Sequence, residues 1–187
     1  MTAKSILPLL VLIALFGVVV PWWRGLSFLD DTMVTAYACL SALFAAPYAV
    51  AQFSRDRPQT MGEAFRRIGL SVAYGFVVTL VILIAGLITV NLNYRRSLHL
   101  PSLDVLAEAL GFGLLLALAL SMLAGWMALR FSAGAARTGL RLVFFGVIAA
   151  VYYWPARLME VALPGAGLAL LCAAAMLWLL KREVMPA

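Results

Sequence analysis

Residues 54–69 read Ser-Arg-Asp-Arg-Pro-Gln-Thr-Met-Gly-Glu-Ala-Phe-Arg-Arg-Ile-Gly and lie between two long apolar runs. This stretch holds four of the fourteen Lys and Arg residues of the chain. Short loops that are rich in Lys and Arg stay on the cytoplasmic side of a bilayer. The stretch therefore predicts a cytoplasmic connection between two membrane-spanning helices.

The same stretch also contains a helix start. Thr60 and Glu63 have the spacing of a capping box, in which a hydroxyl and a carboxylate satisfy backbone N–H groups. Glu63 and Arg67 lie four residues apart in the order that favours an ion pair. At helical spacing, one apolar stripe is formed by Met61, Ala64, Phe65 and Ile68. We predict a short amphipathic helix on the inner membrane surface. This segment has two possible roles. It either docks a cytoplasmic partner through Glu63, Phe65, Arg66 and Arg67, or it is an ordinary solvated loop between two spans.

The composition excludes an ordinary soluble domain. Of the 187 residues, 65% are hydrophobic and only 12% are charged, whereas about half is apolar in a typical soluble protein. The net charge of +6 suits anionic lipid headgroups, because the basic residues flank apolar runs. We expect the lipid bilayer and no nucleic acid as a partner. The two cysteines, Cys39 and Cys172, lie inside apolar runs and predict no disulfide framework.

The apolar runs predict an all-α integral membrane protein of six transmembrane helices in a single domain, residues 1–187. The first run resembles a signal peptide, but Val18-Val19-Val20-Pro21 offers no small-residue cleavage site, so we expect a retained span. The predicted spans are residues 6–23, 32–53, 70–90, 105–129, 140–154 and 164–180.

The basic residues predict that both termini are cytoplasmic. Ten of them fall on the N-terminal side of the membrane: Lys4, Arg55, Arg57, Arg66, Arg67, Arg130, Arg137, Arg141, Lys181 and Arg182. Four fall on the other side: Arg24, Arg95, Arg96 and Arg157. We expect a bacterial cytoplasmic (inner) membrane.

Small residues recur at every fourth position in two of the predicted spans. One set is Ser71, Gly75 and Thr79, and the longer set is Gly113, Ala117, Ser121 and Gly125. Such ladders let helix backbones approach closely in lipid. The longer ladder predicts either packing within the chain, which we favour, or a dimer contact.

Acidic residues lie at the outer ends of the spans. Asp104 and Glu108 share one helix face, and either cap the positive end of the helix or bind a cation at an outer mouth. Capping is the simpler interpretation. No ionisable residue lies near the middle of any predicted span, although ion-coupled transporters usually need one there.

The sequence lacks the common motifs for catalysis and for cofactor binding. The single histidine, His99, cannot by itself form a zinc or bis-histidine haem site. The chain has no Gly-x-Ser-x-Gly nucleophile motif and no phosphate-binding Gly-x-x-x-x-Gly-Lys loop. We therefore predict no enzyme activity, no catalytic residue, no metal and no cofactor, and any energy for transport must come from another subunit.

Six spans, cytoplasmic termini, a basic amphipathic segment after the second span and no ATP-binding motif together resemble the permease subunit of type-2 ABC exporters. The resemblance implies transport driven by a separate cytoplasmic ATPase subunit, a second membrane subunit, and docking of the ATPase on residues 54–69. The alternative is a non-transporting structural or assembly subunit of a larger membrane complex. Complexes that hold pigments or quinone belong to this class. An enzyme acting on lipid at the interface ranks third.

The topology can be tested by cysteine-accessibility labelling in intact cells. In a variant that lacks both native cysteines, a new cysteine at Ser97 should react with an impermeant reagent, because the 95–101 loop is predicted to be outside. A cysteine at Ser54 should react only after the cells are opened. Labelling at Ser54 and none at Ser97 in intact cells would reverse the predicted orientation.

Overall fold

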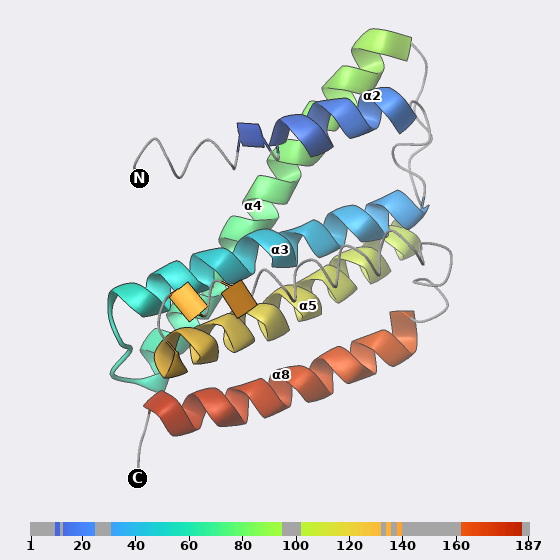
Figure 1. The fold of residues 1–187 in the computed structure, drawn as a ribbon. Helices are drawn as coiled ribbons and strands as arrows, with labels where there is room; N and C mark the ends of the chain where they lie inside the picture. The colour runs from blue at the N-terminus through green and yellow to red at the C-terminus, as the bar shows by residue number, and fades with distance from the viewer. Residues whose placement is uncertain are drawn as a thin grey trace.

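The computed structural model describes residues 10–11, 13–24, 31–94, 102–131, 134–135, 138–139 and 162–184 (Figure 1). These residues are almost entirely helical and contain no strand. The main helices are η1 (Leu15–Val19), α2 (Val20–Arg24), α3 (Asp31–Arg55), α4 (Met61–Tyr94), α5 (Leu103–Arg130) and α8 (Ala162–Val184).

Three of these helices coincide with predicted spans to within a few residues. They are α3, α5 and α8, which match the predictions 32–53, 105–129 and 164–180. The predicted span 140–154 lies outside the described residues. Two of the described helices, α4 over Met61–Leu92 and α5 over Leu103–Arg130, are long and apolar enough to cross a membrane.

The prediction of a separate amphipathic helix before the third span is wrong. A single helix, α4, runs through both segments for 34 residues, about 51 Å at about 1.5 Å per residue. Gly69 is the only weak helix former at the junction, and one glycine costs a helix only about 1 kcal/mol. Burial outweighs that cost, because Ala64 and Ile68 pack in one apolar cluster with Phe53 of α3 and Leu129 of α5.

Helix α3 lies at the centre of the packing. It contacts α4 on one side and α5 on the other, while α8 packs against α5 and the N-terminal η1 and α2 pack against α4 (Figure 1). The buried face of α3 is rich in alanine, with Ala42, Ala45 and Ala49 fully enclosed. Small side chains on this helix let both neighbours come close to its backbone.

Glycines on α4 and α5 complete this close packing. A Cβ atom on Gly75 of α4 would lie 2.1 Å from the carbonyl oxygen of Ser41 in α3. A Cβ atom on Gly113 of α5 would lie 2.7 Å from the carbonyl oxygen of Ala38. Further along the ladder, a Cβ atom on Gly125 would lie 3.1 Å from the ring of Phe53. The ladder therefore faces α3 within the same chain.

The N-terminal helix changes its hydrogen bonding before a proline. Pro21 has no N–H to donate to the Gly17 carbonyl, and in the π-helix η1 the Val20 N–H donates to the Leu15 carbonyl instead of the Phe16 carbonyl. The Tyr37 hydroxyl donates to the Phe16 carbonyl at 2.9 Å. The Thr89 hydroxyl lies 3.2 Å from the Gly17 carbonyl oxygen and 2.9 Å from the Ala85 carbonyl oxygen, so its single proton is shared between the two. Side chains of α3 and α4 thus supply hydrogen-bond donors to both carbonyls.

Two glycines on the same helix provide a matched test of this packing. Gly113→Ala should lower the free energy of unfolding by about 1–3 kcal/mol, because its Cβ atom meets the α3 backbone. Gly111→Ala should leave it unchanged or raise it by up to about 1 kcal/mol, because nothing lies within 4 Å of the new Cβ atom and alanine favours helix. The measurement is thermal unfolding in detergent; equal melting temperatures for the two variants would contradict this account.

Candidate functional site

The candidate site is the end of the bundle where α3, α5 and α8 finish and α4 begins (Figure 1). Most of the Lys and Arg residues in the described segments gather there: Arg55, Arg57, Arg66, Arg67, Arg130, Lys181 and Arg182. An ion pair of 3.7 Å between Arg130 of α5 and Glu183 of α8 holds two of these helix ends together. We call this region the basic end.

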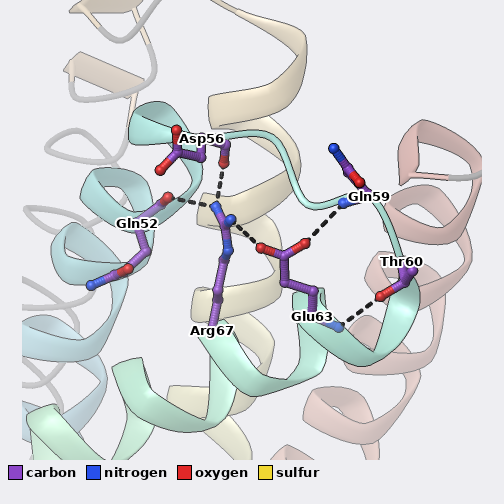
Figure 2. Close-up of polar contacts among 6 residues, drawn as sticks. All are labelled: Gln52, Asp56, Gln59, Thr60, Glu63 and Arg67. Atoms are coloured by element: carbon purple, nitrogen blue, oxygen red, sulfur yellow. Dashed lines mark hydrogen bonds and ion pairs between the residues drawn. The ribbon is translucent and has the colours of Figure 1, made fainter.

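The start of α4 is capped as the sequence predicts, with one difference. The Glu63 N–H donates to the Thr60 hydroxyl at 3.2 Å. The Glu63 carboxylate accepts from the N–H of Gln59 at 3.0 Å instead of from the N–H of Thr60 itself (Figure 2). Two otherwise unpaired N–H groups at the helix start are satisfied in this way.

Arg67 points into the protein and ties α4 to the end of α3. Its guanidinium donates to the Gln52 carbonyl at 2.9 Å and to the Asp56 carbonyl, and it pairs with the Glu63 carboxylate at 2.5 Å (Figure 2). The residue is only 8% exposed, and its guanidinium lies 6.0 Å from the centre of the Phe53 ring. A buried arginine is tolerated here because its donors meet a carboxylate and the carbonyls at a helix C-terminus.

A second arginine ties the same turn to α5. Arg57 donates to the Leu129 carbonyl at 3.0 Å, near the C-terminus of α5. Pro58, the next residue, is buried. The turn between α3 and α4 is therefore held on both sides by arginines that bind carbonyl groups at helix ends.

The four residues predicted to dock a partner divide into two pairs. Glu63 and Arg67 are engaged in contacts inside the turn, and their docking of a partner stays a prediction. Phe65 and Arg66 remain exposed, and Phe65 is 45% exposed. A sequence signal for this division exists, because Arg67 lies four residues before Ser71 and so belongs to the small stripe of Ser71, Gly75 and Thr79 that faces α3.

Sequence reasoning did not assign Gln52, Asp56 or Arg57 to the site. Gln52 and Asp56 contribute only their backbone carbonyls to Arg67, so their side-chain types give no signal. For Arg57, the sequence indicates only a basic residue in a loop and predicts no specific contact. Its role depends on where α5 ends in space, which the local sequence does not contain.

The residues predicted at the outer end lie apart from this site. Asp104 and Glu108 are exposed on the first two turns of α5, and the N-terminal cap of that helix is the Ser102 hydroxyl, which accepts from the Val105 N–H at 3.4 Å. Within the described residues, no group of three His, Cys, Asp or Glu side chains is placed to hold a metal ion.

The ladder residues form part of the packed interior. Ala117 and Ser121 are fully buried between the helices. The hydroxyls of Ser121 and of Thr79 in α4 have no hydrogen-bond partner among the described residues. Gly113, Ala117, Ser121 and Gly125 therefore have a structural role here.

Comparison with known proteins adds no assignment. The chain matches no protein-family model, no curated protein and no solved structure. The functional argument consequently depends on the geometry of the chain itself.

The two adjacent arginines of α4 should respond very differently to truncation. Arg67→Ala should lower the free energy of unfolding by about 1–3 kcal/mol, because it leaves the Gln52 and Asp56 carbonyls without their donor. Arg66→Ala should change it by no more than about 0.5 kcal/mol, because Arg66 is exposed. Thermal unfolding of both variants in the same detergent is the measurement. An equal effect of the two substitutions would show that Arg67 does not hold the turn.

Proposed function

We propose that this chain is an integral membrane protein with six spans and cytoplasmic termini. The observation that carries the proposal is the outward face of α4. Large apolar side chains recur along it at helical spacing, each roughly half exposed: Leu70, Val77, Leu80, Val81, Ile84 and Ile88. A face of this size is unfavourable in water at about 25 cal/mol per Å² of apolar surface, and hydrocarbon is the environment that suits it.

The distribution of charge supports the proposed orientation. The basic end gathers arginines and lysines from four helix ends, whereas the described start of α5 at the opposite end presents Asp104 and Glu108. Residues 140–154 complete the six spans in this proposal on the basis of their apolar sequence. The basic end then lies at the cytoplasmic surface.

Within the membrane, we propose a subunit of a larger complex that has a structural or assembly role. The interior between α3, α4 and α5 combines small residues with large apolar ones such as Phe53 and Ile68, and Arg67 is the one charged residue buried among those described. An interior of this kind supplies no ionisable group at mid-depth to carry a substrate or a proton. The continuity of α4 also favours this role, because the exporter resemblance implied a separate docking helix.

The permease of an ABC-type exporter is the second candidate, and one observation favours it. Phe65 and Arg66 project from the first turns of α4 at the basic end, where a cytoplasmic ATPase subunit would bind. An exposed aromatic residue beside an arginine is a typical anchor at protein interfaces. A second membrane subunit would then complete the transport path.

A single purification distinguishes these proposals. Membranes that contain the tagged protein are washed with alkaline carbonate, solubilised in mild detergent and examined for co-purifying proteins. We expect the protein to resist the carbonate wash and to retain other membrane subunits equally in the parent, Phe65→Ala and Arg66→Glu forms. Release by the carbonate wash would overturn the membrane proposal.

Recovery of an ATPase would support the permease instead. Phe65→Ala should then weaken its binding by about 2 kcal/mol, roughly 30-fold. The matched control is Val77→Ala, which removes a similar apolar group from the same helix on the lipid-facing side. Equal loss in both variants would show that the effect is not specific to the basic end.

A further inference from the structure

The basic end carries an exposed aromatic side chain beside exposed positive charge on three separate helices. In α4 the pair is Phe65 and Arg66, and at the end of α5 it is Arg130 and Phe131. In α8, Trp178 is 62% exposed and is followed by Lys181 and Arg182, three and four residues later on the same helix face. The repetition on three helices defines a surface that no single helix would reveal.

The aromatic rings have little contact that explains their position. Phe131 is 48% exposed, although one edge meets Trp126 at a centroid distance of 5.8 Å. The Arg182 guanidinium lies 5.9 Å from the centre of the Trp178 ring. Aromatic rings next to arginine and lysine are typical of the headgroup level of a bilayer, where one side of the ring is apolar and the other is polar.

The positive charge at this surface is largely uncompensated. The nearby carboxylates of Glu63 and Glu183 are already paired with Arg67 and Arg130, and Asp56 is the remaining acidic residue. In the described part of the chain, no ion pair engages Arg55, Arg66, Lys181 or Arg182. A surface with this excess attracts phosphate-bearing anions.

We propose that the basic end binds the headgroups of anionic phospholipids. Phe65, Phe131 and Trp178 lie at the headgroup level, and the free arginines and lysines contact the phosphates. This inference rests on the proposed membrane location, and it adds the class of lipid that the surface selects. Arg67 and Arg57 take no part, because their guanidinium groups bind carbonyls within the protein.

Fluorescence quenching by brominated lipids tests the proposal at Trp178. In a form that keeps Trp178 and replaces Trp22, Trp23, Trp126 and Trp154 by Phe, quenching reports the lipids beside α8. The full chain is reconstituted into vesicles that contain either brominated phosphatidylglycerol or brominated phosphatidylcholine. The ratio of quenching gives the relative binding constant of the anionic lipid at this site.

We expect a preference for phosphatidylglycerol of about fivefold or more, because each Lys or Arg near a membrane surface contributes about fivefold to the attraction of anionic lipid. Lys181→Gln with Arg182→Gln should bring the ratio close to one. Lys181→Arg with Arg182→Lys should keep the preference, since charge is conserved. Salt at about 1 M should weaken the preference in the parent, because charges are then screened beyond about 3 Å.

The matched control removes the same charge elsewhere. Arg24→Gln with Arg95→Gln neutralises two residues that the sequence assigns to the opposite side of the membrane, and the preference at Trp178 should persist. If neutralising Arg24 and Arg95 reduced the lipid preference at Trp178 as much as neutralising Lys181 and Arg182, the proposal of a local binding site at the basic end would be overturned. A second reporter, Phe65→Trp in a form without other tryptophans, should show the same preference and lose it with Arg66→Gln.

The remaining outcomes separate this inference from the membrane proposal. Equal quenching by the two lipids overturns the inference and leaves the membrane location supported. If polyglutamate also binds the detergent-solubilised protein in that case, the surface fits an acidic segment of a protein partner. No quenching by either lipid overturns both proposals.

Discussion

The close approach of three backbones at Ser41 is the contact on which the rest of this structure depends. The Ser41 carbonyl leaves no space for a side chain at Gly75 of α4. Its hydroxyl donates to the Ala38 carbonyl at 2.6 Å and reaches the Gly113 carbonyl of α5 at 3.5 Å. Lipid chains are as apolar as leucine, so helices in a bilayer associate through packing and hydrogen bonding at contacts like this one.

The alignment at Ser41 also sets the positions of the helix ends. With α4 and α5 held against α3, the C-termini of α3 and α5 lie beside the start of α4, so Arg67 and Arg57 can reach their carbonyls. Helix C-termini carry partial negative charge and unpaired carbonyls. The arginines therefore stabilise an arrangement that packing has already brought together, and the cost of burying Arg67 is offset by its hydrogen bonds.

The division between interior and surface bears on function. Small residues lie where the central helices approach most closely, large apolar side chains fill the rest, and the described core contains no charged group except Arg67. On the outside of the described helices, an apolar flank along α4 meets the basic end. These two surfaces suit lipid hydrocarbon and negatively charged groups respectively.

The sequence by itself determined the helical segments α3, α5 and α8, the basic character of the end where they finish, and the capping of α4 at Thr60. These features depend on local composition and spacing, which each segment contains. It did not determine that the amphipathic segment continues into the following helix, because Gly69 breaks a helix only when burial does not compensate. The sequence places Arg67 on the same stripe as Ser71 and Gly75, but only the tertiary structure turned that stripe toward α3, so that Arg67 points inward while Arg66 points outward. Neighbouring residues on a helix point about 100° apart, so the rotation of α4, set by Gly75 against Ser41, selects which arginine is buried.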